Sequence, residues 1–197
     1  MENKKIKQIS STFDYSVIDV IKKRKSVRSF TDKPIEEEKV KSLFEAARWA
    51  PSSVNEQPWR YIYATKDQPL WKEIFDALND TNQVWVKHAP LLVASFSLKK
   101  LSWNDHANAY SKYDLGAANA FLSLQAAGLG LQIHQLGGYN ANQLRESLRI
   151  PDEFELGAVL AVGYPGDPDI LPEHLKVREL SPRMRIKQGE FVRNETF

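Results

Sequence analysis

Apolar residues recur along this chain with two spacings, and each spacing predicts a different kind of element. Spacings of three and four predict helices after Ser16, from residue 36 toward Pro51, from Pro69, over 107–129 and over 141–149. Apolar or alternating runs predict strands over 59–65, 89–98, 131–136 and 156–162. Because helices alternate with only a few strands and no linker divides the 197 residues, we expect a single α+β domain, a sandwich with a mixed sheet.

Short polar signals predict where some of these helices begin and end. Ser16, with Asp19 three residues later, has the pattern of a capped helix start. Three glutamates at 36–38 place negative charge in a first helical turn, where the helix dipole favours it. Pro51 then ends that helix, since the residue before a proline avoids the helical conformation.

The longest predicted helix, 107–129, is apolar around nearly its whole circumference and is rich in alanine and glycine. A helix of this kind is buried on most of its sides. Its small residues permit the close approach of another backbone, so the composition favours a central helix at a subunit interface.

The chain after Asp167 has no hydrophobic period that supports a core of its own. It is nevertheless apolar enough to dock on another surface, through Val177, Leu180, Met184, Ile186, Phe191 and Val192. This segment is therefore either disordered or an arm packed on another surface.

The composition excludes several classes of protein. Hydrophobic residues make up 42% of the chain and charged residues 26%, which is typical of a globular protein. The longest apolar stretch, 89–98, is too short for a membrane helix, and the first residues lack the apolar segment of a secretion signal, so we expect no membrane contact and a cytoplasmic location.

The chain contains no cysteine, which excludes thiol, disulfide and iron–sulfur chemistry. The four histidines, at 88, 106, 134 and 174, lack the paired spacing of metal ligands, so we expect no metal site. If the protein is a redox enzyme, a bound cofactor carries the electrons.

Positive charge is concentrated at both ends of the chain. Residues 1–28 hold eight basic and three acidic residues, residues 176–197 hold six and three, and the middle is acidic. The ends are solvated tails, a nucleic-acid contact, or two parts of one site for a small anion. A nucleic-acid partner is disfavoured because no basic run exceeds four residues and no aromatic residues are interleaved with it.

The sequence lacks GxGxxG, Walker A and GxSxG motifs, which leaves two polar stretches as candidates. In RKSVRSF, an extended backbone would place Arg24, Ser26 and Arg28 on one face. Two guanidiniums and a hydroxyl suit a phosphate and the polar edge of a heterocycle, although a solvated loop or a phosphorylation site has the same pattern. The second stretch, 50–59, is a proline-bracketed loop of short hydrogen-bonding side chains, which also occurs in plain connectors.

Taken together, RKSVRSF, APSSVNEQPW, IPDEFELGAVLAVGYPGD and SPRMRIKQGEF resemble the nitroreductase family of FMN enzymes. The Ala/Gly-rich helix resembles that family's central dimer helix, and the resemblance covers residues from about 16 to 193. It implies a three-layer sandwich with a mixed, mainly antiparallel sheet in an intertwined homodimer. FMN would bind non-covalently between the subunits, and a C-terminal arm, about 168–197 of the single domain 1–197, would pack on the partner subunit.

The resemblance also assigns FMN-binding residues. The opening motif supplies Arg24, Lys25, Ser26 and Arg28 for the phosphate and the isoalloxazine. The partner subunit's loop supplies Pro51, Ser52, Ser53, Asn55 and Gln57. The flavin edge is contacted by Asn82, the region near N5 by Gln135, Leu136, Gly137 and Gly138, and the phosphate is closed off by Arg183 and Arg185.

The implied reaction passes hydride from NADH or NADPH to flavin N5 and then to an electron-poor acceptor such as a nitroaromatic or a quinone. No side chain is assigned as a catalytic group, because the flavin carries the chemistry. A cation about 4 Å from N1 would favour the reduced form by roughly 4 kcal/mol at an effective dielectric near 20. Arg24 and Arg28 both remain candidates for it. Trp103 and His106, in the short segment 98–107, are the expected substrate-pocket residues.

Three alternatives stay open from the sequence. The first is a specialised relative of the same fold, such as an azoline dehydrogenase, a flavin-cleaving enzyme or a deiodinase, the last disfavoured by the short 98–107 segment. The second is a non-catalytic FMN-binding protein. The third is a nucleic-acid binder, whose affinity would fall steeply with salt.

Overall fold

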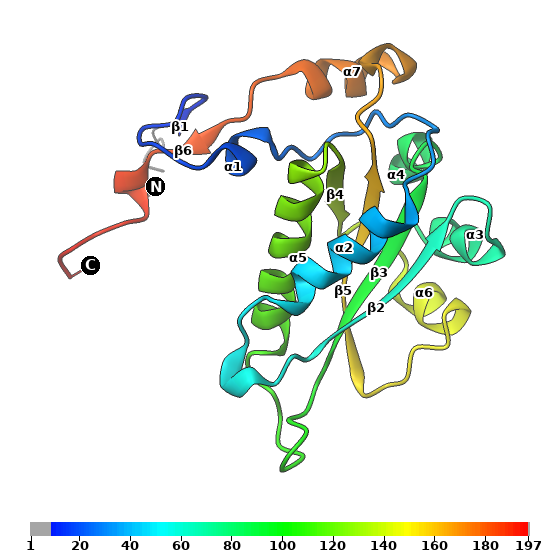
Figure 1. The fold of residues 1–197 in the computed structure, drawn as a ribbon, viewed down its shortest axis with the longest axis vertical. Helices are drawn as coiled ribbons and strands as arrows, with labels where there is room; N and C mark the ends of the chain where they lie inside the picture. The colour runs from blue at the N-terminus through cyan, green and yellow to red at the C-terminus, as the bar shows by residue number, and fades with distance from the viewer. Residues whose placement is uncertain (1–8, 197) are drawn as a thin grey trace, which may run out of the picture.

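The computed structural model describes residues 9–196 and places a four-stranded sheet between two layers of helices (Figure 1). The strand order is β2, β3, β5, β4, formed by Trp59–Thr65, Leu91–Leu98, Phe154–Gly163 and Gln132–Leu136. All neighbouring strands of this sheet are antiparallel. The expected antiparallel majority is confirmed, while the parallel part of the expected mixed sheet is absent from residues 9–196.

Strand β3 shows why the layers form. Leu91 and Val93 pack into one core cluster, with residues of α2 (Glu37–Arg48) and α5 (Ser111–Gly128). Leu92 and Ala94 pack into the other cluster, on the opposite face of the sheet. Because successive side chains of a strand point to opposite faces, a strand covered on both sides is apolar at most positions, as the run at 89–98 predicted, and its two serines, Ser95 and Ser97, are buried.

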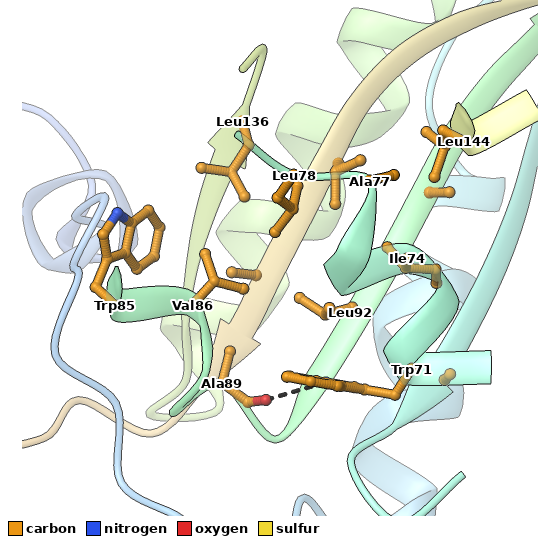
Figure 2. Packing of buried hydrophobic residues seen from close by; sticks show 14 of the residues in the cluster. Trp71, Ile74, Ala77, Leu78, Trp85, Val86, Ala89, Leu92, Leu136 and Leu144 are labelled. Atoms are coloured by element: carbon orange, nitrogen blue, oxygen red, sulfur yellow. Dashed lines mark hydrogen bonds between the residues drawn. The ribbon is translucent and has the colours of Figure 1, made fainter. Parts of the chain in front are cut away.

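The second face of the sheet is covered by α3 (Pro69–Asp76), α4 (Asp80–Val86) and α6 (Ala141–Ser147). Figure 2 shows Leu92 of β3 lying between Val86 of α4 and the α3 side chains Trp71 and Ile74. The indole of Trp71 donates a hydrogen bond to the carbonyl oxygen of Ala89 at 3.2 Å, so this buried polar atom is satisfied (Figure 2).

Helix α5 lies very close to the sheet at Gly157. Strand β3 has an irregular register between Ala94 and Phe96, and the Ser95 hydroxyl in between bonds both the N–H and the carbonyl of Ala158. A Cβ at position 157 would lie 2.5 Å from Leu115 Cδ2 and 2.8 Å from Ser95 Oγ. Glycine is therefore required there by the packing of α5 on β5.

The opposite side of α5 carries an exposed apolar strip. Tyr113 is 77% exposed and Phe121 40% exposed, and Gly116, Ala120 and Gly128 are exposed between and beyond them. The helix is apolar around most of its circumference as expected, but a single chain buries only part of it. This strip is an unpartnered helix face in one chain.

The helix predictions contained one wrong start and missed two helices. Ser16 is not a cap, because α1 (Asp19–Lys23) begins later and its N-cap residue is Ile18, which has no side-chain acceptor. Helix α4 was missed, and so was α7 (Glu173–Leu180). Both are short, and only their tertiary contacts identify them.

The chain after Asp167 first packs on its own domain. Leu171 and Leu175 are buried in the same core cluster as α3 and α4, so the free arm begins only after α7. Beyond it, β6 (Arg185–Ile186) pairs antiparallel with β1 (Ile9–Ser10), which brings the two ends of the chain together (Figure 1). Within the described residues there are also three short 3-10 helices, at Ser53–Asn55, Pro168–Ile170 and Gln188–Glu190.

We expect Gly157→Ala to lower the free energy of unfolding by about 1–3 kcal/mol, because the added methyl group overpacks the contact between α5 and β5. Gly189→Ala is the matched control, since a Cβ there meets no atom within 4 Å. Urea denaturation of both variants measures the difference. Equal stability of the two variants would contradict the close packing at Gly157.

Candidate cofactor-binding site

The opening motif lies alongside the edge strand β4. The side chain of Gln132 accepts from the N–H of Lys25 at 2.7 Å and donates to the carbonyl oxygen of Lys23 at 3.1 Å. Two residues further along both segments, His134 Nδ1 lies 2.9 Å from the carbonyl oxygen of Val27. These bonds hold residues 23–27 next to β4 although the two segments are more than 100 residues apart in the sequence.

His134 is a half-buried, neutral part of this arrangement. Its ring packs on Trp85 with 4.7 Å between ring centroids, and burial lowers the pKa of His134 to about 4. Because a carbonyl oxygen only accepts, Nδ1 must carry the proton and donate it to Val27. The histidine is therefore a fixed support for the opening motif.

Arginines from both ends of the chain meet at the end of α1. Arg183 donates to the carbonyl oxygens of Arg24 at 2.6 Å and Lys22 at 2.8 Å, and Arg24 itself donates to Ser26 Oγ at 3.2 Å. Burial lowers the pKa of Arg24, and the like charges of Arg183 and Arg185 lower it further. The predicted convergence of the basic ends is thus present, although the lysines at positions 4, 5 and 7 lie outside the described residues.

This cluster has the electrostatics of an anion site. Within residues 9–196, Arg24, Arg183 and Arg185 have no carboxylate ion-pair partner, so their positive charges are uncompensated. Guanidiniums of this kind bind phosphate oxygens through charge-assisted hydrogen bonds, often two at a time.

Arg28 lies further along the motif and is held differently. Its N–H donates to the Glu179 carboxylate at 3.0 Å, and its guanidinium Nη1 lies 3.9 Å from the same oxygen. Burial lowers the pKa of Arg28, as does the nearby Arg178, while Glu179 opposes them. Arg28 and Ser26 line a cavity of about 780 Å³, which is in the size range of small-molecule sites.

The backbone just after β4 is held by Asn82. Asn82 donates to the carbonyl oxygen of Gly138 at 2.9 Å, and a Cβ at position 138 would lie 2.6 Å from the same amide nitrogen. Gly137 is exposed and has no atom near its missing side chain, so a ligand can approach its backbone. Leu136 differs from expectation in one respect, because its side chain is buried in the core and only its backbone can face a ligand.

The serine-rich loop is built with unusual backbone conformations. Val54, Asn55 and Gln57 all have positive φ, which costs a non-glycine residue about 1–3 kcal/mol each. The loop is held by bonds from Ser53 N–H to Asp114 at 3.2 Å and from Gln57 N–H to Ser52 Oγ at 3.0 Å. Such strain, kept by specific bonds, is more typical of a functional loop than of a plain connector. Pro51, before the loop, is exposed.

The opening motif and the serine loop lie at opposite ends of α5 in one chain (Figure 1). The serine loop is bonded to Asp114, near the first residue of the helix. The opening motif contacts the other end, where a Cβ on Gly128 would lie 4.0 Å from Val20 of α1 and where Gln132 follows. Between positions 114 and 128 an α-helix rises about 21 Å. A single chain therefore does not bring the two groups of predicted residues together.

The expected substrate-pocket residues lie with the serine loop. Trp103 is 67% exposed at the tip of a hairpin, which His106 closes by accepting from Leu101 N–H at 2.8 Å. The N–H of Ser102 donates to Glu56 at 2.6 Å, which ties this hairpin to the serine loop.

Four supporting residues were missed by the sequence predictions, namely Glu56, Gln132, His134 and Glu179. Glu56 lies inside the second motif but was not assigned a role, and the other three belong to no motif; their partners are 46 to 151 residues away. Within residues 9–196, no three acidic, histidine or cysteine side chains are arranged to hold a metal ion, and no helix is long and apolar enough to cross a membrane.

The chain is thus an α+β sandwich in which basic residues from both ends of the described chain meet beside the edge strand β4. The chain matches the nitroreductase family over residues 21–84 and 67–164. A crystal structure described as an oxidoreductase containing FMN has a TM-score of 0.90 and 34% identity, covering 94% of this chain and 95% of that one.

Two curated relatives carry names of characterised activities. An FMN reductase [NAD(P)H] of Bacillus subtilis (strain 168) is 30% identical over 77% of this chain and 66% of its own length. An iodotyrosine deiodinase of Thermotoga neapolitana is 29% identical over 76% of this chain and 89% of its own length. The chain belongs to the nitroreductase family, which confirms the resemblance found in its motifs.

We expect the stability of the protein to fall as the pH is lowered from about 6.5 to about 4. His134 stays neutral in the folded chain over this range, whereas in the unfolded chain it binds a proton below its ordinary value of 6.5. The loss is at most about 1.4 kcal/mol per pH unit. Unfolding of His134→Gln, compared with the exposed control His174→Gln, measures its share. A pH dependence that is identical in the two variants would contradict a neutral His134 in the folded chain.

Proposed function

We propose that the protein is an FMN-dependent NAD(P)H oxidoreductase that reduces nitroaromatics, quinones or similar electron-poor acceptors. The observation that carries this proposal is the cluster of Arg24, Arg183 and Arg185 beside β4, which has no carboxylate partner within residues 9–196. The FMN named for a similar structure and the NAD(P)H named for a similar reductase support the same assignment.

The residues from the arginine cluster to the end of β4 fit the two parts of FMN. The three guanidiniums would hold the phosphate, with Ser26 beside them, because a doubly charged anion neutralises their mutual repulsion. The isoalloxazine would lie further along, toward residues 135–138, where Gly137 leaves the backbone accessible. A cavity of about 780 Å³ beside this motif offers space of the right order.

Arg28 is the cation best placed for the ring. Arg24 is engaged with Arg183 at the phosphate end, whereas Arg28 lies four residues further along the motif and is anchored by Glu179. A half-buried guanidinium close to the ring favours the negative charge that reduction adds. The sequence left this choice between the two arginines open, and their different partners favour Arg28.

The second half of the site would come from a second copy of the chain. In a two-fold symmetric dimer, two α5 helices packed antiparallel through their exposed strips would place the first turn of one helix beside the last turn of its partner. The serine loop, with Ser52, Ser53, Asn55 and Gln57, would then reach the cofactor site that begins at the partner's Arg24. This arrangement would cover the exposed apolar strip of α5 and would give the strained serine loop a ligand to bind.

When bound, FMN supplies the hydride chemistry, so the chain itself needs no nucleophile. The protein binds the phosphate, orients the ring against the β4 backbone and leaves one side open to reactants. Trp103 and His106, on the hairpin tied to the serine loop, would contact the acceptor. Reductive deiodination is the second candidate reaction, because one relative of similar identity is a deiodinase.

The direct test is purification without added cofactor, followed by anaerobic titration with NADH and NADPH. We expect a yellow protein whose visible absorbance bleaches with at least one of the two reductants and returns when a nitroaromatic or quinone is added. Parallel assays with an iodinated tyrosine separate the second candidate from the first. A colourless protein that does not take up FMN on reconstitution would overturn the proposal.

A further inference from the structure

The side-chain amide of Gln135, on β4, has only one orientation that fits its surroundings. Its Nε2 lies 3.2 Å from Ser123 Oγ and 3.5 Å from the carbonyl oxygen of Asn119, both on α5. A main-chain carbonyl only accepts hydrogen bonds, so the nitrogen must face α5 and donate. The amide oxygen, Oε1, therefore faces away from the helix.

Ser123 enforces the same orientation. Its hydroxyl donates to the Asn119 carbonyl oxygen at 2.7 Å, which leaves only acceptor capacity for Gln135. Ser123 and Asn119 are 4% and 3% exposed, so neither has an alternative partner in water. An inverted amide would set its oxygen against the Asn119 carbonyl and would lose both bonds.

Asn119 is itself fixed by a buried network. Its side-chain oxygen accepts from the Tyr61 hydroxyl at 3.0 Å, and its side-chain nitrogen donates to Ser95 Oγ at 3.2 Å. Ser95 in turn bonds both backbone groups of Ala158 at the irregular point of the sheet. The Asn119 side chain thus ties α5 to β2 and β3, whereas Gln135 contacts only the main-chain carbonyl oxygen of Asn119 and the hydroxyl of Ser123.

The outward oxygen has no partner of its own. Gln135 is exposed, and within residues 9–196 no hydrogen bond reaches its Oε1. Two residues further on, Gly137 opens the backbone at the same end of β4. The side chain therefore presents a pre-oriented acceptor to whatever binds beside β4.

We propose that Gln135 Oε1 accepts a hydrogen bond from a donor group of the bound cofactor, and that Ser123 is the positioning residue that fixes it. This inference rests on the proposed function and assigns the amide a specific role. The phosphate and the flavin carbonyls are acceptors and would not pair with it. The donors of FMN are the ribityl hydroxyls and ring N–H groups, one of which exists only after reduction.

The test compares Gln135→Leu and Ser123→Ala with Tyr61→Phe as the matched control. Tyr61→Phe removes a buried hydroxyl from the same network without touching the bonds of Gln135. Two quantities are measured on each folded variant, namely the dissociation constant of oxidised FMN and the midpoint potential of the bound flavin. Neither quantity depends on turnover with an acceptor.

We expect Gln135→Leu to shift one of these quantities by the equivalent of about three- to tenfold in affinity, the range of one hydrogen bond. Ser123→Ala should shift it less in the same direction, and Tyr61→Phe should leave it unchanged. Weaker binding of oxidised FMN with an unchanged potential identifies a donor present in both oxidation states. A lower potential with unchanged binding of oxidised FMN identifies the ring N–H of the reduced flavin.

An unchanged dissociation constant and potential in Gln135→Leu would overturn the inference while leaving the proposed function intact. A shift of equal size in Tyr61→Phe would also overturn it, since the effect would then come from the core rather than from Gln135. Failure of the wild-type protein to bind FMN would instead refute the proposed function.

Discussion

The bond between Arg183 and the main chain at the end of α1 brings the C-terminal arm to the opening motif. Its guanidinium reaches the carbonyl oxygens of Lys22 and Arg24, where the helix dipole favours a cation. The same bond sets Arg183 beside Arg24, and Arg185 adds a third positive charge whose repulsion no carboxylate in residues 9–196 relieves. The ends of the chain are thus held in an arrangement that an anion would stabilise, and this gives a physical reason for the basic termini.

Helix α5 imposes the second constraint. It is long enough to keep the serine loop, bonded to Asp114, about 21 Å along its axis from Gly128, beside which the opening motif lies. Its exposed strip, with Tyr113 and Phe121, is too apolar to be explained by the packing of one chain. In our proposal a second copy of the chain explains both facts, because it would cover this apolar strip and supply the missing half of the site.

The sequence predicted those parts of the fold that follow from local periodicity. Strand β3 was recognisable because it is covered on both faces, and β2 has the bounds that its alternation predicted, Trp59–Thr65. Helices α4 and α7 were not recognisable, because each buries only one or two side chains, such as Trp85 or Leu175, against distant elements. Ser16 was misleading, since α1 begins at Asp19 and its N-cap residue is Ile18, whose side chain cannot accept a hydrogen bond.

For the candidate site, the sequence indicated residues that form a motif and missed single side chains that support them from distant positions. The motifs identified Arg24, Ser26 and Arg28, whereas Gln132 and Glu179 support them from 107 and 151 residues away. The resemblance placed Leu136 at the flavin, but the alternation of β4 turns its side chain into the core. Side-chain direction, rather than position along the chain, decides which of these residues meets a ligand.

The most direct test of a shared site is complementation between two defective chains. Arg24→Glu reverses a charge in the cationic cluster, and Ser52→Trp breaks the bond to Gln57 N–H and fills the serine loop. Differently tagged copies of the two variants are co-expressed, and the mixed dimer is purified and its FMN content measured. We expect almost no bound FMN in either variant alone and about one bound FMN per mixed dimer, because two-fold symmetry leaves one of the two sites of the mixed dimer intact. A mixed dimer that holds no more FMN than its parents would contradict a site built from two chains.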